Sequence, residues 1–399
     1  MYLICVMTLS TKALALNYIC HSPGTHRKEI ADHFGIHPNL VSDAIRALIR
    51  ERWVVEGESK KSSVGRAPVA LYPDSGSHAA VSVSYSPKSM TCGLINASGE
   101  IIFSTSAAHS QRTPEAVVDL AVQEINKLKK KYKGSIVGLA VADPGMVDHC
   151  QGEVVRSSSF PGWRHVPLAK MFKARTGLNT LVTDVTHARA MAQYRILPGR
   201  RPSADTMFYV DYGSGTVGFT LLTPDGIWRG EGFAGDVGHV VVDPEGPLCR
   251  CGARGCLESR TGTMALENRA AKLLEKGVHS VLSGKRHLTA LEIFSAANEG
   301  DRLAKTIVRE TLADLGLYAA VIIAMFHPRL LVVGAETKGA IEIVTGEIRQ
   351  AINNRIPVEV ASALTVIEGQ PTNPLGLAGA GLMLFERVIQ FEAKRKKVA

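Results

Sequence analysis

The chain has 399 residues, 45% of them hydrophobic and 21% charged, which is typical of a soluble globular protein with two or three domains. The formal net charge of +9 is compatible with a nucleic-acid partner but does not prove one. Apolar runs such as residues 317–326 are too short to cross a bilayer, and residues 1–9 lack a basic n-region. We therefore expect a cytoplasmic protein without a signal peptide or a membrane anchor.

Residues 11–75 have the pattern of a separate small domain. Apolar residues at helical spacing predict one helix around Tyr18 and a second helix over residues 26–34. Gly35 ends the second helix, and Pro38 suits the first position of a third helix because its missing N–H is not needed there.

Two extended segments follow the third predicted helix. Residues 53–55 and 69–72 have strand patterns, and the polar, glycine-containing stretch 56–68 separates them. Three helices, a tight turn before the third and then a hairpin are the layout of a winged helix-turn-helix DNA-binding domain. Residues 73–78 have the composition of a linker.

After this linker the pattern changes to α/β. Short strands are followed by a predicted helix over residues 114–131 and by an apolar strand, 180–183, that ends at Asp184. A second cycle of the same kind starts with the strand 207–212. Two α/β halves predict a two-lobed fold with a cleft between the lobes.

One histidine and three cysteines lie close together in the second half: His239, Cys249, Cys251 and Cys256. One imidazole and three thiolates form a closed tetrahedral zinc set, which is typical of a structural rather than a catalytic site. The alternative is that these cysteines are buried free thiols. An odd, clustered set of cysteines without a secretion signal favours metal over disulfides and a reducing compartment.

The stretch GDVGHVVVDPEGPLCRCGARGCLES, residues 235–259, is similar to the signature of the ROK family, which groups repressors and sugar kinases. The motif FPGW at 160–163, the following run 164–177 and the tail 373–388 extend the resemblance to roughly residues 79–390. It implies a two-lobed, actin-like (ribonuclease-H-like) ROK domain, often dimeric or tetrameric. A winged helix in front of that domain marks the repressor branch.

The resemblance also implies a sugar site in the cleft. The family's catalytic base matches Asp184, although Thr183 and Thr186 replace the flanking asparagines. Carboxylates and an imidazole bind the vicinal hydroxyls of a sugar well. The alternative for Asp184 is a turn residue at the end of a strand. Residue by residue, the resemblance predicts an effector site of Ser159, Asp184, Asp236, His239 and Glu258.

The nucleotide side differs from that of the family's kinases, which begin with D-x-G-G-T. The corresponding residues 84–88 contain no carboxylate and no glycine, and Pro87 removes an N–H that a phosphate needs. A second phosphate loop is partly kept at 213–218, although a simple β-turn explains it too, and a third is reduced to 334–336. We predict no ATP binding and no kinase activity, with Asp184 as a vestigial base and zinc as the cofactor.

A winged helix-turn-helix reads base edges with the N-terminal part of its third helix and contacts DNA with its wing. Asparagine and arginine make bidentate contacts to adenine and guanine, respectively. The alternative is a winged helix that serves only protein contacts, because its local charge is mildly basic. The predicted DNA-binding residues are Pro38, Asn39, Ser42 and Arg46 on the helix and Lys60, Lys61 and Arg66 on the wing.

These features together predict a transcription regulator that represses carbohydrate genes as a homodimer or tetramer. Its partners are a double-stranded DNA operator and a sugar or sugar derivative that controls DNA binding from the cleft. Two alternatives stay open. One is an ATP-dependent sugar kinase of the same family, and the other is a regulator controlled by a partner protein.

Overall fold

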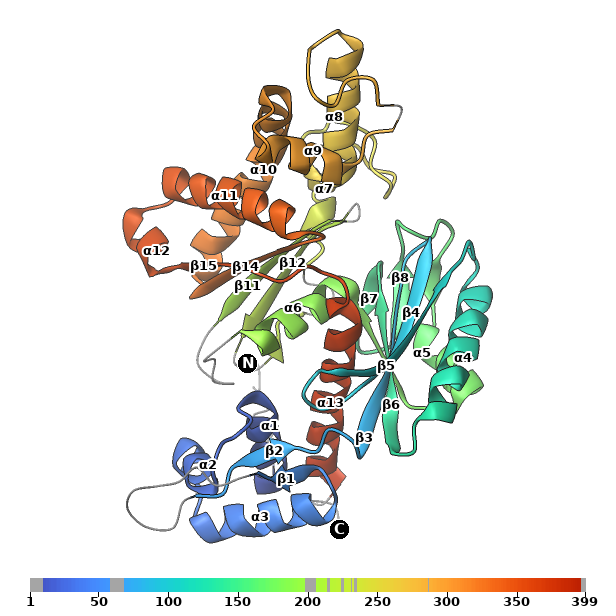
Figure 1. The fold of residues 1–399 in the computed structure, drawn as a ribbon, viewed down its shortest axis with the longest axis vertical. Helices are drawn as coiled ribbons and strands as arrows, with labels where there is room; N and C mark the ends of the chain where they lie inside the picture. Colours follow the sequence, from blue (N-terminus) through green and yellow to red (C-terminus); the bar gives the residue numbers. More distant parts are fainter. Residues whose placement is uncertain are drawn as a thin grey trace.

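The computed structural model describes residues 10–57, 68–197, 206–213, 216–223, 226–230, 232, 235–285 and 287–395. A small helical domain lies at one end of the molecule, and two α/β lobes follow it (Figure 1). No helix in the described part of the chain has both the length and the apolar character needed to cross a membrane.

The small domain contains three helices and a two-stranded antiparallel hairpin, in the predicted order. Its elements are α1 (Thr11–His21), α2 (Arg27–Phe34), α3 (Pro38–Arg50), β1 (Val54–Glu56) and β2 (Leu71–Pro73). Gly35 ends α2 in the left-handed conformation, with φ of 63°. Residue 26 is the N-cap of α2 and not its first helical residue, because Glu29 accepts the backbone N–H of His26.

The first lobe is built on a five-stranded mixed sheet in the order β10-β6-β3-β4-β5. Its strands are β3 (His78–Tyr85), β4 (Ser89–Ile95), β5 (Ile101–Ala108), β6 (Ser135–Asp143) and β10 (Thr180–Asp184). Helices α4 (Pro114–Lys131) and α5 (Leu168–Thr176) pack against it, and a small sheet contains β7 (Met146–Asp148), β8 (Glu153–Arg156) and β9 (Arg164–Val166). The linker is reduced to the turn 74–77, which the Asp74 carboxylate stabilises by accepting N–H groups of Gly76 and Ser77.

The second lobe repeats this topology. Its sheet has the order β13-β12-β11-β14-β15, so that each lobe joins an antiparallel three-stranded meander to two parallel strands. The strands are β11 (Met207–Gly213), β12 (Thr216–Thr223), β13 (Gly226–Ile227), β14 (Leu330–Ala335) and β15 (Thr365–Glu368). The helices are α7 (Leu257–Thr261), α8 (Thr263–Glu275), α9 (Ala290–Asn298), α10 (Arg302–Phe326), α11 (Lys338–Arg355) and α12 (Val358–Ala363). The prediction of two α/β halves is confirmed.

Two helices connect the three parts of the molecule: α6 (Val185–Ile196) and α13 (Leu375–Arg395). They pack against each other, and α13 continues down to α1 of the small domain (Figure 1). One hydrophobic core runs through this junction without a break, from Ile19 and Trp53 in the small domain to Phe385 and Ile389 on α13. The small domain is therefore docked on the first lobe by buried apolar surface and not merely tethered to it.

Candidate functional site

The predicted zinc ligands converge in the structure. Their four ligand atoms, one from each of His239, Cys249, Cys251 and Cys256, all lie within 4.8 Å of one another. The Sγ of Cys249 is 3.6 Å from Nδ1 of His239, and the Sγ atoms of Cys251 and Cys256 are 3.6 Å apart. Zn–S bonds of ~2.3 Å and a Zn–N bond of ~2.0 Å at tetrahedral angles require separations of about this size. These separations therefore fit a zinc ion held by the four side chains.

The loop that carries these ligands depends on glycine. Gly255 has φ of 66°, and a Cβ there would lie 1.5 Å from the carbonyl oxygen of Asp243. Only a residue without a side chain allows this approach, which brings the Cys256 end of the loop back beside His239. Burial and the neighbouring thiols raise the pKa of Cys256 to about 12, so a cation is needed to hold this ligand as a thiolate at neutral pH.

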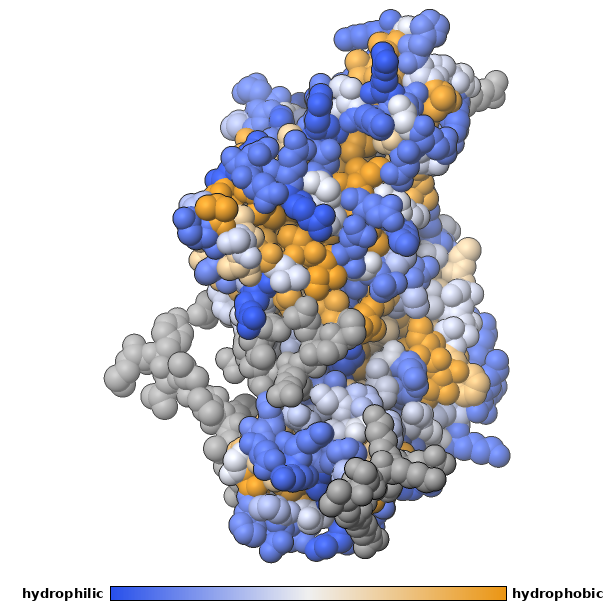
Figure 2. Space-filling model, turned by 60° about the vertical axis from the view of Figure 1, so that its left-hand side comes forward, coloured by the Kyte–Doolittle hydropathy of each residue, from blue (hydrophilic) through white to orange (hydrophobic). Residues whose placement is uncertain are grey.

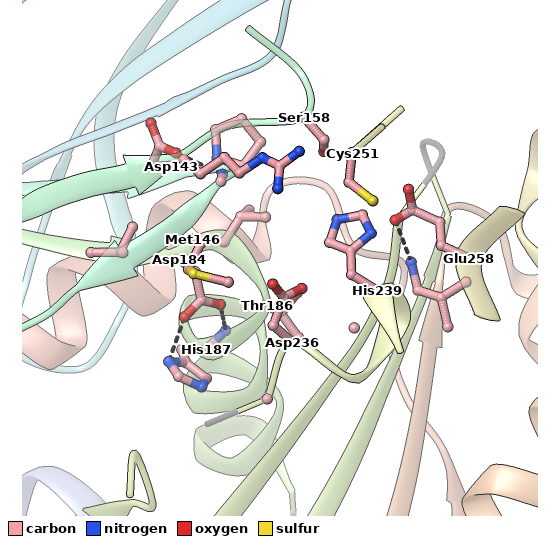
Figure 3. A pocket seen from close by; sticks show the side chains of 18 of the residues that line it. Asp143, Met146, Ser158, Asp184, Thr186, His187, Asp236, His239, Cys251 and Glu258 are labelled. Carbon is pink, nitrogen blue, oxygen red and sulfur yellow. Dashed lines mark hydrogen bonds and ion pairs between the residues drawn. The ribbon is translucent and has the colours of Figure 1, made fainter. Parts of the chain in front are cut away.

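The cleft between the lobes adjoins this loop (Figure 3). It is lined by the ends of β6 and β10, the first turn of α6, β12 and the loop around His239. Of the predicted effector residues, Asp184, Asp236, His239 and Glu258 line the cleft together. Ser159 is not among the lining residues; its neighbour Ser158 is.

Asp184 is the last residue of β10 and the N-cap of α6. Its Oδ1 accepts the backbone N–H of His187 at 2.8 Å, while its Oδ2 lies 2.5 Å from Nδ1 of His187 and 3.5 Å from Nε2 of His149. Burial raises the pKa of the Asp184 carboxyl, but the two imidazoles outweigh it and hold the pKa well below its usual range. The carboxylate therefore stays ionised in the cleft.

The other carboxylates of the cleft differ in their surroundings. Desolvation by the cleft walls raises the pKa of Asp236, against the influence of His239, although the side chain is exposed. Glu258 is buried, accepts the backbone N–H of Val217 at 3.4 Å and lies 3.2 Å from the Arg250 guanidinium. Asp143 is completely buried, and this burial raises its pKa to about 6 although the Tyr85 hydroxyl donates to it.

The segment that corresponds to the kinase motif is a closed turn between β3 and β4. The Oγ of Ser86 accepts the N–H groups of Lys88 and Ser89, so these amides are not free for a phosphate. Ser84 and the stem of Arg189 both lie near Gly376, and the Arg189 guanidinium pairs with the buried Asp211 carboxylate at 2.8 Å. A buried guanidinium at this position opposes a magnesium ion by charge repulsion.

On the small domain, the predicted helix residues have the expected exposure. Val41, Ile45 and Leu48 are buried, whereas Pro38, Asn39 and Arg46 are exposed and Ser42 is half-buried. The Arg46 guanidinium contacts the Asp43 carboxylate one turn earlier on the same helix. The predicted wing residues Lys60, Lys61 and Arg66 lie outside the described residues.

The predicted effector site did not include several polar residues that line the cleft, among them Asp143, His149, Arg156, Ser158 and His187. His187 could have been found, because a residue three positions after a helix N-cap lies beside the cap. His149 and Arg156 come from the small sheet region of the first lobe, and only the tertiary fold brings His149 to Asp184 and Arg156 to Asp236.

The fold and the cleft define a two-lobed, actin-like α/β protein with a histidine–cysteine metal-type loop beside its cleft. The model of the ROK family matches residues 81–387, and the chain belongs to this family. The xylose repressor of Caldicellulosiruptor bescii is 26% identical over 86% of this chain and 87% of its own length. The glucokinase of Thermotoga maritima is 27% identical over 74% of this chain and 94% of its own length.

The similarity to solved structures extends to the small domain. A structure of a ROK family transcriptional regulator, a homologue of the E. coli MLC protein, covers 97% of this chain and 98% of its own. Its TM-score is 0.81 at 22% sequence identity, so this match concerns the fold. Because it covers 97% of this chain, the match includes the helices and the hairpin in front of the two lobes. The match to the Thermotoga maritima glucokinase covers a smaller share, 74% of this chain.

Proposed function

We propose that this protein is a DNA-binding transcription regulator, a repressor of carbohydrate genes, whose winged helix-turn-helix is controlled by a sugar or sugar derivative in the cleft. The observation that carries the proposal is the position of α6. Its first residue follows Asp184 in the cleft, and its last turn carries Arg195, which donates to the carbonyl of Cys20 on α1 at 2.9 Å. One rigid helix thus joins the effector site to the DNA-binding domain.

The mechanism follows from this connection. A sugar that hydrogen-bonds to Asp184, Asp236, His239 and Glu258 joins residues of both lobes and favours one lobe arrangement over another. The first turn of α6 moves with Asp184, and the last turn transmits the displacement through Arg195 to α1. The sugar therefore changes the orientation of the two recognition helices in an assembly without touching the DNA.

The zinc loop serves this mechanism as a structural element. A zinc ion on His239 and the three cysteines would fix the backbone that carries Asp236 and Glu258, so that effector contacts are formed in a rigid loop. Because the four protein ligands complete the tetrahedron, the ion itself has no open position for chemistry.

We further propose that the kinase chemistry has been lost. Among the described residues, the Ser86 hydroxyl occupies the amides of Lys88 and Ser89, and Arg189 pairs with the Asp211 carboxylate, which disfavours phosphate and magnesium at these positions. A glucokinase is among the relatives of this chain, and the resemblance to such kinases matches Asp184 to their catalytic base. In this protein we assign Asp184 two other roles, a contact to the sugar and the cap of α6.

The proposed assembly is a homodimer or a tetramer, because winged-helix domains read paired half-sites as symmetric copies. An apolar stripe on α10 fits such an interface: Leu317, Val321 and Met325 are exposed at spacings of one helical turn, and Phe326 and Trp228 extend it. Apolar surface is visible on the side of the molecule that carries α10–α12 (Figure 2). Light scattering should show Met325→Glu with a smaller mass than wild type.

The proposal is tested by fluorescence anisotropy with duplexes from the upstream regions of neighbouring genes, with and without a panel of sugars and sugar phosphates. We expect one duplex to bind preferentially and one compound to change its affinity by at least tenfold. The variant Arg195→Met should still bind DNA but respond less to the compound, because the link between α6 and α1 is lost. A protein that prefers no duplex and responds to no compound would contradict the proposal.

A further inference from the structure

A second group of metal-type ligands lies in the cleft, apart from the four zinc ligands. His149, Asp184 and His187 direct Nε2, Oδ2 and Nδ1 toward one another, within 4.8 Å. The separations are 2.5 Å from Asp184 to His187, 3.2 Å between the two histidines and 3.5 Å from Asp184 to His149. Two imidazoles and one carboxylate arranged in this way are the protein ligands of many divalent transition metals.

The distances suit such an ion. Metal–nitrogen and metal–oxygen bonds of about 2.1 Å, at tetrahedral or octahedral angles, place neighbouring ligand atoms roughly 3.0–3.4 Å apart. Two of the three separations are already close to this range. The third, between Asp184 and His187, needs only about half an ångström of side-chain rotation within the first turn of α6.

The local structure directs one oxygen of Asp184 to this point. Because the helix cap uses Oδ1 for the backbone N–H of His187, Oδ2 is left for the imidazoles and for an ion. Asp184 and His187 are fixed on one helical turn, while His149 approaches from the loop after β7. The side chains of His149 and His187 are 8% and 3% exposed, so water competes little for their nitrogens.

The surrounding charge also suits a cation. The carboxylates of Asp143 and Asp236 both lie within electrostatic reach of Asp184. Arg229 acts on Asp184 with one positive charge, and Arg156, which also lines the cleft, acts on Asp236. With the Asp184 carboxylate itself included, three carboxylates face two guanidinium groups, so that a net negative charge surrounds the ligand set. All three ligands line the cleft, which leaves the remaining coordination positions of an ion facing its interior.

From this geometry we propose that His149, Asp184 and His187 bind a divalent first-row transition metal ion, separate from the zinc on the cysteine loop. Because three protein ligands leave open positions, this ion exchanges with solvent, whereas the four-ligand zinc does not. An effector in the cleft, which rests on the function proposed above, would meet these open positions with vicinal hydroxyl or carboxylate oxygens.

The test uses the full-length protein with its tightly held zinc in place. Weakly held metal is removed with a mild chelator, the chelator is dialysed away, and Co²⁺ is titrated while visible absorption and bound metal are measured. We expect one additional Co²⁺ per chain with ligand-field bands and without the charge-transfer bands of thiolate ligation. Wild-type protein that binds no further Co²⁺, or Co²⁺ that shows only thiolate bands, would overturn the proposal.

Variants locate the ion. His187→Gln and His149→Gln should each weaken Co²⁺ binding by more than about 100-fold, because a lost ligand costs more than a lost supporting contact. The matched control is His165→Gln, an exposed histidine of the same lobe whose side chain is 75% exposed. His149 lies outside the helix, so its variant is informative even if His187→Gln unfolds α6. A folded His149→Gln variant that binds Co²⁺ with wild-type affinity would refute the metal site. This outcome does not depend on DNA binding, so it is distinct from a failure of the proposed function.

Discussion

Trp53 of the small domain stacks on His78, the first residue of the first lobe's sheet, with ring centroids 3.8 Å apart and planes 10° from parallel. The His78 ring also hydrogen-bonds the carbonyl of Glu51 at 3.1 Å, and Phe385 of α13 meets the Trp53 ring edge-on. These contacts hold the two domains in one orientation. A change of the cleft can reach the small domain through these contacts, because they join the two domains directly.

The first prediction concerns this contact. Trp53→Ala should lower the free energy of unfolding by about 3 kcal/mol, because it removes a buried aromatic ring from the core shared by both domains. Limited proteolysis should then cut within residues 73–78, which wild type protects. The control is Trp228→Ala: Trp228 is 47% exposed in the second lobe, and its loss should leave cleavage at 73–78 unchanged.

The second prediction concerns pH. Burial, helped by the Arg195 guanidinium, lowers the pKa of His21 to about 3, so His21 is neutral beside Glu386 when the protein is folded. The unfolded chain takes up this proton near pH 6.5 and the folded chain does not, so stability is complete above pH 6.5 and falls as pH drops toward 3.

The slope from this one group is about 1.4 kcal/mol per pH unit below 6.5. Urea unfolding at several pH values should show that the free energy of unfolding of His21→Gln depends less steeply on pH than that of wild type. The difference in slope should be up to about 1.4 kcal/mol per pH unit. His165→Gln, in which an exposed histidine is replaced, should keep the wild-type profile. Equal profiles for wild type and His21→Gln would show that His21 is not the group responsible.

Local signals in the sequence were sufficient for elements with clear ends. The helix over residues 114–131 was predicted with its observed bounds because Pro114 occupies its first position and an amphipathic pattern follows. The helix α6 was not predicted, because nine of its residues are buried and no polar face marks its period. The strand patterns at 81–83, 92–96 and 101–104 mark only parts of the strands β3 to β5, since serine and threonine residues interrupt the apolar pattern.

The same distinction holds for the site. The four metal-type ligands His239, Cys249, Cys251 and Cys256 follow from a short sequence spacing, and Asp184 follows from the family motif. The position of His149 beside Asp184 depends on where the loop after β7 crosses the end of β10, which no local pattern encodes. The Arg189–Asp211 ion pair is likewise a tertiary feature, because these residues lie on α6 and β11.

A third prediction concerns the cysteine loop. Purified protein should retain one zinc per chain through chelator dialysis, and Cys251→Ser should lose it, because only three ligands remain. The loop that holds Asp236 and Glu258 should then loosen, and the thermal midpoint should fall by several degrees. The control is Cys150→Ser, an exposed cysteine outside the loop, which should keep the zinc. Wild type with well under one zinc per chain would contradict the prediction.

A fourth prediction concerns catalysis. With ATP, magnesium and a broad panel of hexoses and amino sugars, a coupled assay should show no turnover above background, because the phosphate-binding amides at residues 86–89 are occupied. ATP-dependent product that disappears in Asp184→Asn would instead establish a kinase with Asp184 as its base.

The last prediction concerns DNA. Arg46 lies on the exposed face of α3, one turn after Ser42, with 71% of its side chain exposed and its guanidinium paired with Asp43. Arg46→Ala should weaken operator binding by roughly 1–3 kcal/mol and relax the preference at one base position, provided that Arg46 contacts a base edge. A phosphate contact would instead weaken binding to all sequences alike and reduce the salt dependence by about one unit of slope.

Binding of wild type, Arg46→Ala and Lys60→Ala/Lys61→Ala to operator and scrambled duplexes across a salt series distinguishes these two contacts. The lysine variant should lose affinity for both duplexes equally, because lysines on a wing contact the phosphate backbone. The matched control is Lys170→Ala, an exposed cation on α5 of the first lobe, which should bind both duplexes as wild type does. If Arg46→Ala and the control behave identically on the operator, α3 does not read DNA, and the function proposed for this protein fails with it.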